Sequence, residues 1–110
     1  MLSDDIDSLF SCILLEQIKS WNIQFFYDFY SLYITKETNL KQRPIAVDIA
    51  VNLQGFKCFD NHVTMLNPTD TVNEQSINFN TIDRVNRTNY FNKYCGSTLL
   101  MLWALYDMPL

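Results

Sequence analysis

Hydrophobic residues recur at every third or fourth position through the first twenty residues of the chain. This period predicts an amphipathic helix over residues 3–20. Ser3 can cap its first turn. Three aspartates lie in that turn, where the positive end of the helix dipole favours negative charge. We expect the apolar stripe to face the core; it consists of Ile6, Leu9, Phe10, Ile13, Leu14, Ile18 and Trp21.

The next segment is dominated by aromatic residues. FFYDFYSLY, residues 25–33, holds six aromatic side chains in nine positions. Phe26, Phe29, Tyr30 and Tyr33 share one face at helical spacing, so the pattern predicts a second helix over residues 22–37. Few polar positions interrupt it, and we therefore expect this helix to be covered on more than one side.

Strict alternation of apolar and polar residues begins after a loop at 38–44, which Pro44 closes. IAVDIAVNL predicts a half-buried strand over residues 45–53. Val47, Ile49 and Val51 are expected inside, whereas Asp48 and Asn52 are expected to face solvent or a polar contact. Turns at Gln54–Gly55 and Asp60–Asn61 then separate two further strands, at 56–59 and 62–66. The middle of the chain therefore predicts an antiparallel meander.

A polar loop over 67–76 leads to a short strand near Ile77 and Phe79, followed by a helix that Asn80 or Thr81 caps and that runs to about Tyr94. Ser97 can cap a last helix through Leu105, although the apolar run at 98–106 also suits a buried strand. Together these elements predict a single α+β domain over residues 1–110. It has an N-terminal helical pair, a central antiparallel β-meander and C-terminal helices packed on one face of the sheet.

The composition fits a folded chain. Hydrophobic residues make up 48% and charged residues 18%, which is too apolar for a disordered protein. The net charge of −4 gives no general attraction to phosphates or anionic membranes. The acidic first residues do not resemble a signal peptide, and no apolar run approaches the length of a membrane span. We expect an intracellular protein, in the cytoplasm or nucleus, that does not bind membranes.

Catalytic residues are scarce. His62 is the only histidine, and Cys58 is the thiol nearest to it in sequence, so a thiol enzyme would depend on that pair. Cys12 and Cys95 lack the paired spacing of zinc ligands. Two distant glycines exclude a glycine-rich phosphate loop. We expect no enzyme, no metal and no cofactor.

A nucleic-acid role has one candidate segment. Residues 83–94, DRVNRTNYFNKY, interleave basic and aromatic side chains. Arg84, Arg87 and Lys93 suit phosphates, and Tyr90 can stack on a base. The low number of charges and the acidic chain make nucleic acid the alternative hypothesis only.

The first hypothesis is a non-catalytic protein–protein interaction module or a small subunit of a larger assembly. Its basis is more aromatic surface than one small domain can cover. We expect a homodimer or a heteromeric complex with another protein chain. The predicted contact residues are Tyr27, Tyr30, Tyr33, Trp103 and Tyr106.

Overall fold

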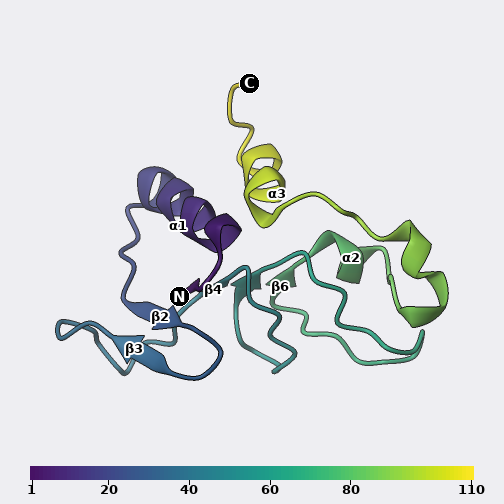
Figure 1. The fold of residues 1–110 in the computed structure, drawn as a ribbon, viewed down its shortest axis with the longest axis horizontal. Coiled ribbons are helices and arrows are strands. Elements are labelled where there is room, and N and C mark those ends of the chain that lie inside the picture. The colour runs from purple at the N-terminus through teal and green to yellow at the C-terminus, as the bar shows by residue number, and fades with distance from the viewer.

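A computed structural model describes all 110 residues and has an α+β arrangement of short elements (Figure 1). Two small three-stranded sheets form its base, and two helices lie above them. The first sheet contains β1 (Leu2–Ser3), β2 (Phe25–Tyr27) and β3 (Leu32–Ile34). The second contains β4 (Ala46–Val47), β5 (Cys58–Phe59) and β6 (Ser76–Ile77). The helices are α1 (Ile6–Lys19), α2 (Phe79–Ile82), the 3-10 helix η1 (Arg87–Asn92) and α3 (Thr98–Leu105).

The predicted antiparallel meander is wrong. β4, β5 and β6 are all parallel, with Val47 opposite Phe59 and Phe59 opposite Ile77. The strand predicted at 45–53 stops after Val47 because Asp48 has a φ of 57°, a left-handed conformation that breaks an extended chain. Gly55 turns the chain with a φ of 77°, as predicted. After a longer loop, however, β5 runs in the same direction as β4 and not back along it. Residues 62–66 form no strand.

The predicted helix at 22–37 is also wrong, and with it the N-terminal helical pair. The aromatic segment forms a β-hairpin from β2 and β3, in which Phe26 pairs with Tyr33. Phenylalanine and tyrosine favour strands, where their rings pack across a pair; these two ring centroids lie 5.8 Å apart. The turn depends on Asp28, whose carboxylate accepts the backbone N–H groups of Tyr30 and Ser31.

The helix predicted at 3–20 is confirmed as α1, although Asp5 rather than Ser3 caps it. Its buried face carries Ser8, Ser11, Cys12, Leu14 and Leu15. The Ser8 hydroxyl donates to the carbonyl oxygen of Val47 at 2.7 Å and accepts the N–H of Ser3 at 2.8 Å. A single small hydroxyl side chain, that of Ser8, therefore joins α1 to both sheets.

The C-terminal elements agree in part. Ser97 caps α3 as predicted, and 98–106 contains this helix rather than a strand. The long helix expected up to Tyr94 is instead the four-residue α2, capped by Asn78, and the kinked η1. The core joins α1, α3 and the second sheet; its buried apolar side chains are Cys12, Leu14, Leu15, Val47, Phe59, Met101 and Leu102.

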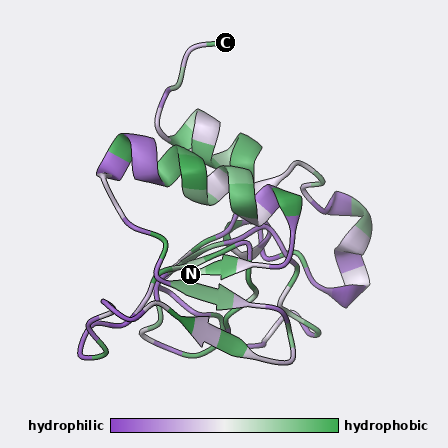
Figure 2. Ribbon diagram, turned by 60° about the vertical axis from the view of Figure 1, so that its left-hand side comes forward, coloured by the Kyte–Doolittle hydropathy of each residue, from purple (hydrophilic) through white to green (hydrophobic).

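Helices α1 and α3 run in the same direction. The carboxylate of Asp7, in the first turn of α1, accepts the N–H groups of Thr98 and Leu99 at the start of α3. At the other end, the Lys19 ammonium lies 4.7 Å from the ring centre of Tyr106, which ends α3. The two helices therefore form a parallel pair above the sheets (Figure 2). No helix of the chain has the length and apolar character that crossing a membrane requires.

Candidate functional site

The outer face of α1, which we define as Ile6, Leu9, Phe10 and Ile13, is apolar and exposed. The exposed fractions of these residues are 72%, 40%, 50% and 38%. Their spacing of three, four and seven positions places them in one stripe along the helix. The sequence predicts this stripe as core, whereas the structure turns it away from the sheets. An amphipathic helix normally buries such a stripe, so this face is the strongest candidate for a contact surface.

Helix α3 adds apolar surface to the same layer. Its sequence, TLLMLWAL, is apolar nearly all round, but only Thr98, Met101 and Leu102 are buried. Leu100 is 55% exposed, and Ala104 is also exposed. In Figure 2, hydrophobic colour covers most of both helices. The helix pair therefore presents more apolar surface than the core of this chain uses.

Acidic residues flank the outer face of α1. Asp4 and Asp5 are exposed just before Ile6, the first residue of this face. Glu16 is exposed three positions after Ile13, its last residue. The basic residue nearest to this face in sequence is Lys19, whose ammonium lies against the ring of Tyr106. The surroundings of the stripe are therefore negative.

The structure does not bring the five predicted contact residues together. Tyr27, Tyr30 and Tyr33 belong to the β2–β3 hairpin, and Tyr30 at its tip is 95% exposed. Trp103 and Tyr106 belong to α3, where both are half-buried against the core. Figure 1 shows the hairpin and α3 at different parts of the molecule. The tyrosines of the hairpin are thus available to a partner, but they form no single surface with the α3 residues.

The nucleic-acid candidates lie on the segment that contains η1. The Arg84 guanidinium donates to the carbonyl oxygen of Pro68 at 2.8 Å. Lys93 lies 5.6 Å from the ring centre of Tyr90. Arg87 is exposed, and its backbone N–H donates to Leu66. Two of the three cations therefore already have partners within the chain.

A second group of polar side chains lies at the carboxyl ends of β4 and β5. One ligand atom each from Asp48, Asp60 and His62 lies within 4.8 Å of the other two. Asp48 is 8% exposed and Asp60 only 1% exposed. Of the two outcomes predicted for Asp48, solvent or a polar contact, the structure shows the polar contact, with the Thr98 hydroxyl. The ring nitrogen Nδ1 of His62 lies 2.5 Å from Oδ1 of Asp60, and the His62 side chain is 55% exposed. We call this group the Asp48–Asp60–His62 cluster.

Burial and hydrogen bonding change the pKa values in this cluster. Burial raises the pKa of the Asp48 carboxyl, and the hydroxyl of Thr98, which donates to it at 2.7 Å, partly opposes that change. The hydrogen bond with Asp60 raises the pKa of His62. Asp48 and His62 therefore both have a raised pKa, so each retains its proton more readily than the isolated side chain does.

The thiol–histidine pair considered above does not form. Cys58 has no hydrogen bond to His62; its sulfur instead accepts a weak contact from the Asn73 amide at 3.9 Å. Burial raises the pKa of the Cys58 thiol, whereas a nucleophilic cysteine needs a lowered pKa. This arrangement gives Cys58 no activation.

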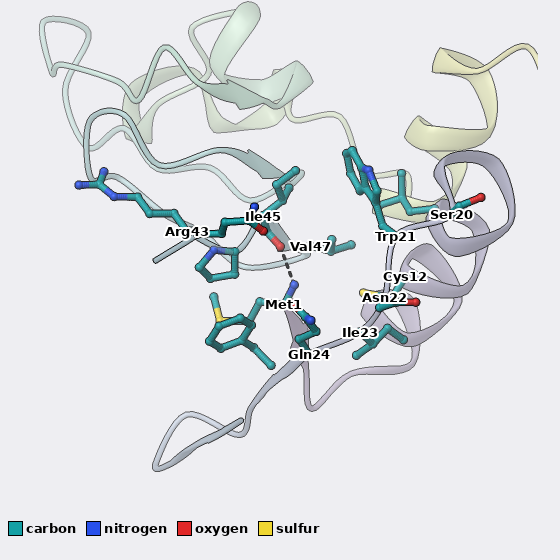
Figure 3. Close-up of a pocket in the computed structure, with 14 residues that line it drawn as sticks. Met1, Cys12, Ser20, Trp21, Asn22, Ile23, Gln24, Arg43, Ile45 and Val47 are labelled. Carbon is teal, nitrogen blue, oxygen red and sulfur yellow. Dashed lines mark hydrogen bonds between the residues drawn. The ribbon is translucent and has the colours of Figure 1, made fainter. Parts of the chain in front are cut away.

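A hollow of about 340 Å³ lies between the end of α1 and the segment before β4 (Figure 3). The amine of Met1 lies in it and donates to the carbonyl oxygen of Ile45 at 2.6 Å. Burial lowers the pKa of this amine and raises that of the Cys12 thiol. The side chain of Arg43 extends away from Met1 in Figure 3. Apolar and polar residues both line the hollow; eight of its fourteen lining residues are hydrophobic.

Sequence reasoning missed both the exposure of the α1 stripe and the Asp48–Asp60–His62 cluster. The signal for the first is the small-residue stripe of Ser8, Ser11 and Cys12, whose spacing marks a close contact on the opposite face of α1. The signal for the second is that Asp48, Asp60 and Asn78 each directly follow a two-residue strand. Neither pattern is decisive before the parallel pairing is known.

Comparisons with known proteins give no relative for this chain. No family model matches it, and no curated protein and no solved structure is significantly similar to it.

Proposed function

We propose that the chain is a non-catalytic protein–protein interaction module, or a small subunit of a larger assembly, that binds through the outer face of α1. One observation carries this proposal: four large apolar side chains at helical spacing are all exposed. Contiguous apolar surface of this kind marks contact sites in folded proteins. The hydrogen bonds from Ser8 and the cap from Asp7 hold α1 in this orientation, so the face is preformed.

The charges around the face favour a particular kind of partner. Asp4, Asp5 and Glu16 would meet like charges if two copies of α1 paired in opposite directions, and like-charge contacts oppose association. A membrane is disfavoured for the same reason, because helices that lie on membranes carry lysine and arginine beside their apolar face. We infer a different protein chain that supplies its own apolar helix or strip with basic residues on its flanks.

Selective co-purification tests this proposal. The tagged wild-type chain, a Phe10→Ser/Ile13→Ser variant and a Leu40→Ser control are used to retain partners from the native source. Leu40 is 73% exposed and lies on a loop apart from α1. We expect a protein that wild type and control retain and that the α1 variant loses. Equal retention by all three chains contradicts the proposal. If the retained protein is a second copy of the same chain, the face of α1 forms a homodimer and not a heteromeric complex.

A further inference from the structure

The parallel pairing of the second sheet places three polar residues in one row. Because Val47, Phe59 and Ile77 are in register, the residues that follow them, Asp48, Asp60 and Asn78, line the carboxyl edge of this sheet. The backbone N–H of Asp48 donates to Phe59, and that of Asp60 donates to Ile77, which extends the pairing to this row. The carboxyl edge of parallel strands is a frequent place for ligands, since side chains from several strands converge there.

Asp48 and Asp60 of this row already accept hydrogen bonds. Oδ1 of Asp48 accepts the Thr98 hydroxyl at 2.7 Å, and its second carboxylate oxygen has no donor. Oδ2 of Asp60 accepts a hydrogen bond from the side-chain amide of Asn78 at 3.3 Å. Oδ1 of Asp60 lies next to Nδ1 of His62. Asp48 is more than nine-tenths buried. One side of the Asp48 carboxylate is therefore left open next to Asp60 and His62.

The negative charge of the row is only partly neutralised within the chain. The only ion pair in the chain joins His62 to Asp60, so no lysine or arginine neutralises Asp48. The charge of Asp7 adds to the negative potential at Asp48. Two buried carboxylates beside a single imidazole are costly, because burial penalises charge that is not paired. A bound cation would remove that cost.

We propose that Asp48, Asp60 and His62 are the protein ligands of a divalent-cation site at the carboxyl edge of β4 and β5. Two carboxylates and an imidazole suit a cation such as Mn²⁺, which accepts both oxygen and nitrogen ligands. No thiol belongs to the cluster, so soft, thiolate-seeking metals are not favoured. The exposed side chain of His62 gives the ion access from solvent, and water would fill the remaining coordination positions. This site is separate from the outer face of α1 and does not depend on the proposed docking function.

The test uses Mn²⁺ alone, whose free form gives an electron paramagnetic resonance signal that disappears on binding. We expect one ion per chain with a dissociation constant in the micromolar range. Asp48→Asn and His62→Gln should each weaken binding by about tenfold or more, on the scale seen when metal sites lose a supporting group. Asp48→Asn keeps an oxygen for the Thr98 hydroxyl, and His62 is exposed, so both variants should remain folded by circular dichroism.

The control is Asp83→Asn, which removes an exposed carboxylate outside the cluster. It should bind Mn²⁺ as the wild type does. The proposal is overturned if the wild type needs millimolar Mn²⁺, or if either cluster variant binds as tightly as the control. Alkylation of the exposed Cys95 before the titration should leave the affinity unchanged, which separates this site from binding by that thiol.

Discussion

Asp7 caps the helix that begins at Thr98, ninety-one positions further along the chain. Oδ2 of Asp7 accepts the Thr98 N–H at 2.7 Å, while Oδ1 accepts that of Leu99 at 2.9 Å. Both N–H groups belong to the first turn of α3, which has no other partner for them within the helix. This contact fixes α3 parallel to α1 and so determines which side of the helix pair stays free.

Replacement of Asp7 should therefore loosen α3. We expect Asp7→Ala to lower the free energy of unfolding by about 1 kcal/mol, the usual cost of losing a helix cap. Asp4→Ala is the matched control, because the Asp4 side chain is exposed and makes no hydrogen bond. Urea unfolding measures both variants. Equal stability of the two would show that the contact between Asp7 and α3 does not hold the helix pair together.

Two neighbouring residues of α3 should differ sharply in their contribution to stability. Met101 is fully buried at the centre of the core, whereas Leu100 is 55% exposed. Met101→Ala should cost about 2–5 kcal/mol through lost burial and the cavity left behind. Leu100→Ala should change stability by no more than about 0.5 kcal/mol. Thermal and urea unfolding of the two variants test this assignment, and a larger loss for Leu100→Ala would mean that α3 is rotated.

The hairpin turn should respond to acid through Asp28. Hydrogen bonds from the N–H groups of Tyr30 and Ser31 lower the pKa of Asp28 below its ordinary value of 3.8. At a pH above that ordinary value, the charged carboxylate therefore stabilises the turn. This contribution to the stability of the hairpin is lost as the pH falls through the lowered pKa. A carboxyl titration followed by NMR should give a pKa below 3.8. Titration at or above that value would contradict the turn geometry.

An Asp28→Asn variant provides the control for this effect. It keeps an acceptor oxygen for the turn but cannot titrate. Amide protection factors in the β2–β3 hairpin, which correct the exchange rate for its intrinsic pH dependence, should then no longer fall as the pH falls through the acid range. A hairpin that still loosens with acid in this variant would assign the effect to another group.

The helices with strong end signals could be predicted from the sequence. The aspartates before Ile6 and the cap at Ser97 mark α1 and α3, and both helices form. The faces of α1 could not be assigned, because the widest apolar stripe is normally the buried one. Here Ser8 and Ser11 are buried instead, and the Ser8 hydroxyl donates to the carbonyl oxygen of Val47, which lies far away in sequence.

The strands were harder to predict for two physical reasons. The aromatic segment satisfies a helical period, but the ring pair of Phe26 and Tyr33 across β2 and β3 and the Asp28 turn favour the hairpin. The alternating segment at 45–53 ends early at Asp48, whose side chain is held by Thr98 from α3. Long-range contacts thus overrode a local pattern, and the same contacts assembled the Asp48–Asp60–His62 cluster.

The most direct measurement of the docking claim is site-specific photocrosslinking from the outer face of α1. Benzoylphenylalanine is placed at position 10 or, as a control, at position 53; Phe10 is 50% and Leu53 is 64% exposed. Both chains are irradiated in the native source, and the crosslinked products are identified by mass spectrometry. We expect one dominant partner chain that is crosslinked from position 10 and not from position 53. The same products from both positions, or none from position 10, would contradict the docking claim.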